Sequence, residues 1–303
     1  MTDMTAFQRE ISHLLPDIKL LHNEPMSKHT SFRIGGPAEV MAFPENADQL
    51  AEILKLSTVL DRKPAIIGAG TNILAPDEGL PGLTICLKDN LSAVEQLDAT
   101  HIRADAGATM TKAAVFAANA GLSGLEFAHG IPGSVGGGVY MNAGAYGGEI
   151  KDVLLSAQVM TYDGTVHTYT AAEMEFSYRH SRLEEQPGIV LSAVFELAPK
   201  PVEEIRGYMQ ELAAKRKASQ PLDKPSAGSA FKRPVGGYAA ALIDQAGLKG
   251  YQVGGAAISE KHAGFAVNMG GATAEDVKKL LQQVSQMVYE KSGILLEPEV
   301  RIW

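Results

Sequence analysis

The sequence predicts an α+β protein with two domains. Its 303 residues suggest two domains at about 150 residues each. Hydrophobic residues make up 45% of the chain and charged residues 20%, which suffices for a sizeable core. Helical and strand patterns are mixed along the chain without regular strand–helix alternation, which favours α+β over a doubly wound parallel sheet.

Helices are expected where apolar residues recur at helical spacing. The first expected helix, at residues 5–15, stops before Pro16. The third begins at the candidate N-cap Thr109 and ends before Gly121. In the last, Thr273 and Asp276 form a capping-box-like start. The expected helices cover residues 5–15, 47–60, 109–119, 202–217 and 274–291.

Strands are expected in short runs of β-branched and apolar residues between turn signals. Asp163-Gly164 is a strong hairpin signal between two of them. Pro199-Lys200-Pro201 marks a candidate domain boundary, which divides the chain into residues 1–199 and 200–303. The expected strands cover residues 64–67, 83–87, 101–105, 153–162, 165–170, 189–197 and 294–303.

Composition excludes several classes of protein. A net charge of −8 argues against general nucleic-acid binding, which depends on neutralising phosphates. One cysteine, Cys86, permits no internal disulfide and no Cys-rich metal site, and we expect it to be a buried, inert thiol. The eight histidines lack ligand spacing, so no metal is expected. No run of about 18 apolar residues and no secretory signal is seen, so we expect a cytoplasmic protein.

Glycine is concentrated in one part of the chain. Ten of the 31 glycines fall between Gly121 and Gly148. The run Gly68-Ala-Gly-Thr-Asn-Ile73 begins like a dinucleotide-binding fingerprint but has isoleucine in the sixth position, and no Walker-type motif occurs. Tight turns would explain a single such motif. The clustering instead favours a backbone cradle for a pyrophosphate or nucleotide, with side-chain contacts from Asn72 and Asn142.

Three further segments contain residues that could carry chemistry. Ser229 and Lys232 match the S-x-x-K pattern of acyl-serine enzymes, but the companion motifs are absent, so a proton-donating serine fits better. Arg179 offers a planar fork for a carboxylate. Alternation places Glu297, Glu299 and Arg301 on one face of the final strand. Each segment alone is more often an ordinary polar surface.

Together these segments resemble the flavin-dependent UDP-N-acetylenolpyruvoylglucosamine reductases of bacterial peptidoglycan synthesis. Each segment is short, but six of them in this order are highly specific. The resemblance runs from about His29 to Trp303 and rests on residues 29–37 (HTSFRIGGP), 68–72 (GAGTN), 130–145, 178–181 (YRHS), 227–232 (AGSAFK) and 296–301 (LEPEVR).

The resemblance implies a vanillyl-alcohol-oxidase-like flavin fold. Residues 1–199 would form a two-lobed FAD-binding unit, with lobes at roughly 1–82 and 83–199. Residues 200–303 would form a smaller α+β substrate domain, whose last strand returns to the active site. FAD would be bound noncovalently, with its pyrophosphate on the glycine-rich segments. The implied cofactor-binding residues are Arg33, Gly68, Ala69, Gly70, Thr71, Asn72, Gly130, Ile131, Pro132, Gly133, Ser134, Gly137, Asn142, Gly144 and Ala145.

The implied reaction has two halves, both passing through the flavin. NADPH would reduce it, and the enolpyruvyl ether of a UDP-sugar would then accept the hydride at C3. Arg179 would bind the carboxylate, Glu299 would hydrogen-bond the developing enol, and Ser229 would protonate C2 through a relay of water or Lys232. Substrate contacts are expected from Tyr178, Lys217, Lys232 and Gln245. Neither a metal nor an obligate protein partner is expected.

The short connections after Ser181 and Pro234 resemble the shorter subtype of the family, which lacks a tyrosine-bearing loop that closes over the substrate. Three alternatives remain open. A different FAD oxidoreductase would keep the glycine cradle without needing Arg179, Ser229 and Glu299 together. An acyl-serine hydrolase would use Ser229 and Lys232 without flavin. A nucleotide-binding regulatory module would bind its ligand without turnover.

Overall fold

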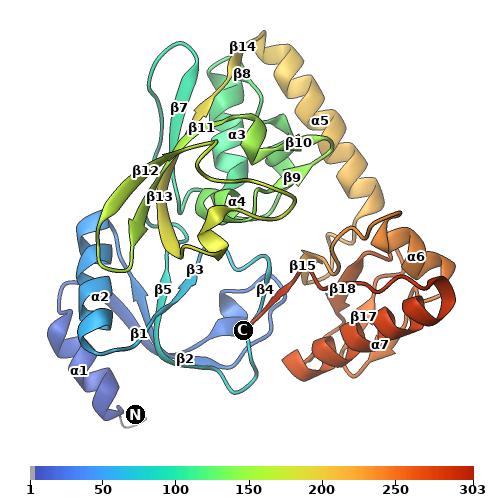
Figure 1. The fold of residues 1–303 in the computed structure, drawn as a ribbon, viewed down its shortest axis with the longest axis horizontal. Helices are drawn as coiled ribbons and strands as arrows, with labels where there is room; N and C mark the ends of the chain where they lie inside the picture. The colour runs from blue at the N-terminus through green and yellow to red at the C-terminus, as the bar shows by residue number, and fades with distance from the viewer. Residues whose placement is uncertain (1–3) are drawn as a thin grey trace. The chain divides into compact units, whose positions relative to one another are not determined.

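The computed structural model describes residues 4–303, and the chain divides into two compact units. Unit 1 contains the residues up to His22, Val40–Ala69 and Gly82–Lys215; unit 2 contains Asn23–Glu39, Gly70–Pro81 and Arg216–Trp303. The division falls within three strands and one helix, so the chain passes between the units several times: β1 (Lys19–Pro25), β2 (Pro37–Phe43), β5 (Leu80–Cys86) and α5 (Val202–Ser219) (Figure 1).

The first part of unit 1 is built on a four-stranded sheet with the order β1-β2-β5-β3. The edge strand β3 (Ala65–Ile67) pairs in parallel with β5. The helices α1 (Ala6–Leu14) and α2 (Ala47–Val59) accompany this sheet (Figure 1), and each has a side-chain N-cap, Thr5 and Asn46. Their apolar faces form a core in which Ile11, Leu50, Ile53, Leu54 and Ile85 are fully buried.

The second part of unit 1 is a five-stranded antiparallel sheet with the order β12-β11-β13-β7-β6. The helices α3 (Met110–Asn119) and α4 (Val135–Tyr140) contribute small residues to its core, around the fully buried Phe195. The strands of this sheet are β6 (Val94–Gln96), β7 (His101–Asp105), β11 (Leu154–Thr161), β12 (Val166–Thr170) and β13 (Gly188–Glu196). Short two-stranded pairs join β9 (Gly144–Ala145) to β10 (Gly148–Glu149) and β8 (Leu122–Ser123) to β14 (Ala198–Pro199).

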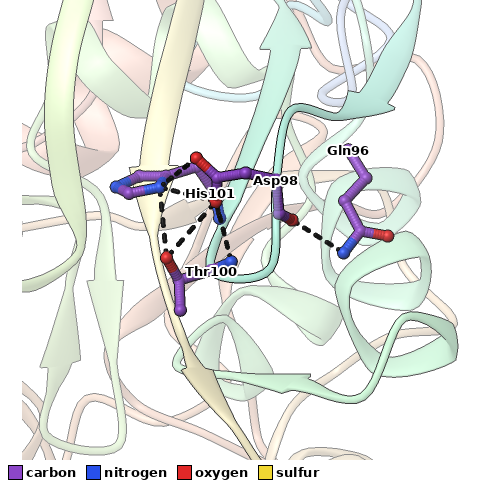
Figure 2. Close-up of polar contacts among 4 residues, drawn as sticks. All are labelled: Gln96, Asp98, Thr100 and His101. Carbon is purple, nitrogen blue, oxygen red and sulfur yellow. Dashed lines mark hydrogen bonds and ion pairs between the residues drawn. The ribbon is translucent and has the colours of Figure 1, made fainter.

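The turn between β6 and β7 is organised by a single carboxylate. Asp98 accepts hydrogen bonds from the backbone amides of Thr100 and His101 and lies 2.9 Å from His101 Nδ1 (Figure 2). The amide of Thr100, followed by the His101 side chain, lowers the pKa of Asp98 to about 2. The turn is therefore held by an ionised side chain over the ordinary pH range.

Unit 2 has a four-stranded sheet with the order β15-β18-β17-β16 and two α-helices of its own, besides the end of α5 and the short helix η1 (Met26–Lys28). The longer helix, α7 (Ala274–Ser292), buries Val277, Leu280, Leu281, Val284 and Val288 in a core shared with Phe32, Ile34 and Leu74 from the two earlier segments of the unit. The remaining elements are α6 (Ala239–Gln245), β4 (Ile73–Leu74), β15 (Ser226–Ser229), β16 (Gln252–Val253), β17 (Ala256–Ile258), β18 (Phe265–Asn268) and β19 (Arg301–Ile302).

All five expected helices form, and the predicted N-caps Thr109 and Thr273 accept the expected hydrogen bonds. The expected strand at 294–303 is much shorter, because only Arg301–Ile302 is a strand, parallel to β4. Pro298 lacks an amide hydrogen, and an isolated bridge joins it to Phe231. The alternation that places Glu299 and Arg301 on one face would place Val300 and Ile302 together on the other, but Val300 is buried and Ile302 is 45% exposed.

Cys86 is buried as predicted, and desolvation raises the pKa of its thiol. Across the described chain, none of the helices combines the length and hydropathy needed to cross a membrane. Within the same residues, no cluster of three or more His, Cys, Asp or Glu side chains could hold a metal ion.

Candidate active site

In unit 1 the structure brings the two predicted glycine segments side by side. A Cβ atom on Gly68 would collide with the Oγ atom of Ser134. Ser134 is buried and is the N-cap of α4, where its hydroxyl accepts a hydrogen bond from the amide of Gly137. Gly137 and Pro132 are exposed, and Gly68 and Gly133 are half-buried. The result is a surface with little side-chain cover, which suits the close approach of a dinucleotide pyrophosphate.

Part of the glycine cluster serves internal packing instead. A Cβ atom on Gly138 would lie 2.7 Å from Met110 Sδ, and one on Gly148 would lie 2.6 Å from Phe127 Cδ1. Glycine is needed at both places because neighbouring elements approach too closely for a side chain. The glycine cluster therefore combines positions that allow close packing with positions that leave the backbone open. The sequence alone did not distinguish these two kinds of position.

Arg179 lies at the tip of a tight turn in unit 1. Ser177 and His180 form an isolated antiparallel bridge, and each donates its amide to the carbonyl of the other. Between them, Arg179 adopts a left-handed conformation with φ of 57°. Its guanidinium donates to the Gly144 carbonyl at 3.1 Å and lies 5.0 Å from the ring centroid of Tyr178, which is 46% exposed. The fork is thus anchored at one edge within unit 1.

An ion pair follows this turn. His180 Nε2 lies 2.8 Å from Glu185 Oε1, just beyond the short helix η4 (Arg182–Glu184). The hydrogen bond that His180 donates to Glu185 is the main cause that raises the pKa of His180, with smaller contributions from the charges of Glu185 and Glu184. The same hydrogen bond lowers the pKa of Glu185. The ion pair therefore connects His180, the residue after Arg179, to Glu185, the residue after η4.

Asn142 is fully buried, and both the nitrogen and the oxygen of its side-chain amide form hydrogen bonds. Its Nδ2 atom donates to Glu149 Oε2 at 2.7 Å and to the Ser177 carbonyl at 3.0 Å. Its Oδ1 atom accepts from the amide of Lys151 at 3.0 Å. Both amide hydrogens are therefore used within unit 1. The partners Glu149 and Ser177 were missed by the sequence analysis, because no local pattern links residues this far apart.

In unit 2, Ser229 and Glu299 belong to neighbouring stretches of backbone. Ser229 ends β15 and is exposed, and the next carbonyl, that of Ala230, accepts from the amide of Glu299 at 2.9 Å. Asn72 completes the arrangement, since its Nδ2 atom donates to the Glu299 carbonyl at 3.2 Å and its own carbonyl accepts from the Arg301 amide. Asn72 is thus tied to the backbone on both sides of Val300.

Three other predicted cofactor-binding positions, Arg33, Gly70 and Thr71, lie in connected loops of unit 2. The Gly70 carbonyl accepts from the amide of Ser31 at 3.0 Å. Gly70 has φ of +62°, and a Cβ atom there would collide with the His29 carbonyl oxygen, so glycine is required. Arg33 is exposed and also left-handed, with φ of 56°. Thr71 is half-buried between Gly70 and Asn72.

The expected substrate contacts in unit 2 lie on separate surface elements. Lys232 Nζ is 3.6 Å from Glu297 Oε2, in an exposed pair beside the Ser229 segment. Lys217 is exposed near the end of α5, where its carbonyl accepts from Lys261 Nζ. Gln245 is exposed at the end of α6. Only Lys232 lies on the segment that contains Ser229.

Comparison with known proteins places these features in one family. Residues 38–170 match a model described as "FAD binding domain", and residues 220–303 match the C-terminal domain of UDP-N-acetylenolpyruvoylglucosamine reductase. A protein of that name from Agathobacter rectalis is 50% identical over 308 aligned positions, which cover 98% of both chains. The chain belongs to the UDP-N-acetylenolpyruvoylglucosamine reductase family.

Other members of the reductase family agree with this assignment. One from Latilactobacillus sakei is 48% identical, over 94% of this chain and 93% of its own. The crystal structure of the Thermus caldophilus reductase matches with a TM-score of 0.78 at 36% identity, over 94% of this chain and 98% of that one. The α+β flavin fold expected from the sequence is therefore confirmed.

Proposed function

We propose that this chain catalyses the NADPH-dependent, FAD-mediated reduction of UDP-N-acetylglucosamine enolpyruvate to UDP-N-acetylmuramate in peptidoglycan precursor synthesis. The observation that carries the proposal is the family match over 98% of the chain, with the FAD-binding model preceding the reductase C-terminal model. The chain is an FAD-containing oxidoreductase whose substrate is a UDP-sugar. We place it in the cytoplasm, with no obligate protein partner, and in the shorter subtype of its family.

The chain's own residues fit noncovalent FAD. The bare backbone beside Gly68 and Ser134 supports a pyrophosphate site in unit 1, formed by Gly68, Ala69, residues 130–134, Gly137, Gly144 and Ala145. Arg33 and residues 70–72 of unit 2 complete the proposed set. When bound, FAD supplies the hydride-transfer chemistry. The protein orients the reacting groups and provides the electrostatic environment. Residues 1–199 are proposed to hold the cofactor, and residues 200–303 to bind the UDP-sugar.

Three side chains are proposed to manage the charge and the proton of the substrate. Arg179 binds the enolpyruvyl carboxylate with its planar fork. Glu299 hydrogen-bonds the enol that develops as charge builds at C2, and Ser229 donates the proton to C2. A serine hydroxyl is a weak acid, so it needs a relay through water or Lys232. Tyr178, Lys217 and Gln245 are proposed to contact the rest of the substrate.

The test separates the two half-reactions. The purified protein is expected to be yellow, to release FAD on denaturation and to be bleached by NADPH without oxygen. Adding UDP-N-acetylglucosamine enolpyruvate should restore the colour and yield UDP-N-acetylmuramate. A colourless protein that cannot be reconstituted with FAD would overturn the proposal. Bleaching by NADPH without reoxidation by this substrate would indicate another FAD oxidoreductase.

A further inference from the structure

The side chain of Asn142 joins two segments that are distant in sequence. It is fully buried, and its backbone has φ of 41°, a conformation that asparagine tolerates better than most residues. One amide hydrogen is bonded to Glu149 and the other to the carbonyl of Ser177. With both donors engaged inside unit 1, the side chain has none left for a ligand.

Ser177 is the base of the turn that presents Arg179. Its carbonyl accepts from Asn142 and also from the His180 amide across the turn. Arg179, at the tip, is left-handed, a strained conformation for a bulky residue that persists only where surrounding contacts impose it. Asn142 supplies one such contact at the base of the turn.

A second contact comes from the same hairpin that holds Asn142. The Arg179 guanidinium donates to the Gly144 carbonyl, and Gly144 of β9 is paired with Glu149 of β10. Glu149 in turn accepts from Asn142 and lies 3.3 Å from Lys151 Nζ. A closed ring of contacts therefore runs from Asn142 through Ser177, Arg179, Gly144 and Glu149 back to Asn142.

We propose that Asn142, held by Glu149, is a positioning residue for Arg179 and does not bind the cofactor through its side chain. This inference rests on the proposed role of Arg179 in binding the substrate carboxylate. It replaces our expectation from the sequence that the Asn142 amide contacts FAD. The ring fixes both the base of the Arg179 turn and one edge of its guanidinium.

The variant N142D tests this directly. It keeps the size of the side chain and the acceptor for Lys151, but it loses both donors and places a carboxylate against Glu149. We expect the oxidised holoenzyme to bind UDP-N-acetylglucosamine enolpyruvate about tenfold or more weakly, because a buried acceptor loses its partner. FAD affinity and the rate of reduction by NADPH should stay within about twofold of wild type. E149Q, which keeps an acceptor for Asn142, should lose much less.

A double-mutant cycle with R179A decides whether Asn142 acts through Arg179. The double variant should bind substrate no more weakly than R179A alone, because the positioning effect has nothing left to act on. S192A, which removes a buried hydroxyl bonded to Gln158 elsewhere in unit 1, is the control for general destabilisation and should leave substrate affinity unchanged. Multiplicative losses in the cycle, or a loss of FAD affinity in N142D, would overturn the proposal.

A readout without substrate keeps this inference separate from the proposed function. Amide hydrogen exchange in residues 177–181 should be faster in N142D than in wild type, because the base of the turn is released. Unchanged exchange would reject the positioning role whatever the enzyme reduces. If the wild-type holoenzyme does not turn over the enolpyruvyl substrate, the proposed function fails, while the exchange experiment still decides for or against the role of Asn142.

Discussion

At the residue scale, Gly68 shows how one missing side chain shapes the proposed cofactor surface. Its Cα atom lies so close to Ser134 that even a methyl group would displace the hydroxyl. That hydroxyl is the cap of α4, so the loop before the helix and the loop at Gly68 depend on each other. A substitution at either residue should therefore disturb the packing of both loops.

We therefore expect G68A to lower the free energy of unfolding by about 1–3 kcal/mol, the usual cost of overpacking. The double variant G68A/S134G should recover part of this loss, because it removes the colliding hydroxyl. G137A is a matched control, since a Cβ atom there would meet Ser134 Oγ at 3.4 Å, an ordinary contact. Denaturant unfolding measures all three, and equal losses for G68A and G137A would contradict the packing argument.

A second prediction at this scale concerns Ser229. We expect S229A to reduce the rate of enolpyruvyl reduction by at least about 100-fold, the usual contribution of a proton donor, and to leave flavin reduction by NADPH nearly unchanged. Stopped-flow absorbance follows the two half-reactions separately. R179K should be costly in the same half-reaction, because lysine lacks the planar fork. If S229A slows both halves equally, Ser229 is not the specific proton donor.

At the element scale, local signals predicted five helices and six of the seven expected strands, but not the two-residue strands such as β19. The caps Thr109 and Thr273 act within their own first turns, so their effect is visible in a few residues of sequence. By contrast, β19 exists because Ile73–Leu74 offers it a parallel partner, and the stretch before it is held by Ala230 and Lys232. Such pairing depends on segments far apart in the chain.

The same distinction between local signals and contacts of distant segments applies to the proposed active site. The motifs around Arg179, Ser229 and Glu299 stand out in the sequence because their residue types suggest chemistry. The side chains of Asn142 and Glu149, which hold the Arg179 turn, do not stand out in this way. The sequence suggested Asn142 as a cofactor contact, and no motif pointed to Glu149. Their role appears only when the hairpin and the turn are brought together.

The pair of His180 and Glu185, which lie on either side of η4, gives a pH-dependent prediction. The raised pKa of His180 adds stability that is present below its ordinary value near 6.5 and lost as the pH rises through the raised value. The lowered pKa of Glu185 adds stability that is present above about 4.5 and lost as the pH falls. The difference in melting temperature between wild type and E185Q should therefore be largest between about pH 5 and 6.5.

Thermal unfolding from pH 4 to 9 tests this expectation. E52Q, at an exposed position of α2 that takes no part in this pair, is the control. Its melting temperature should follow that of wild type closely at each pH. A difference between wild type and E185Q that persists unchanged at pH 9 would contradict the ionic origin of the effect.

At the scale of the whole molecule, unit 2 is assembled from three separate pieces of chain. Its core needs Phe32, Ile34 and Leu74 from the two earlier segments. In addition, the Asp77 carboxylate accepts from the amides of Ala274 and Glu275 at the start of α7. The region matched by the reductase C-terminal model, residues 220–303, therefore lacks part of its own core and the additional carboxylate acceptor at the start of α7.

We expect the isolated fragment 216–303 to remain largely unfolded. It loses three buried side chains worth about 1.5–3 kcal/mol each, which is comparable to the whole stability of a domain this small. Circular dichroism and the dispersion of amide resonances measure this. Adding peptides 23–39 and 70–81 should restore some structure. A fragment that unfolds cooperatively on its own would contradict this reasoning.

The scattered origin of unit 2 also affects the order of events during protein synthesis. Segments 23–39 and 70–81 leave the ribosome long before Arg216, at about 5–20 residues per second. Until then the apolar side chains of Phe32, Ile34 and Leu74 have no final partners. The nascent chain must therefore carry them uncovered for several seconds, during which chaperones or premature association compete with folding.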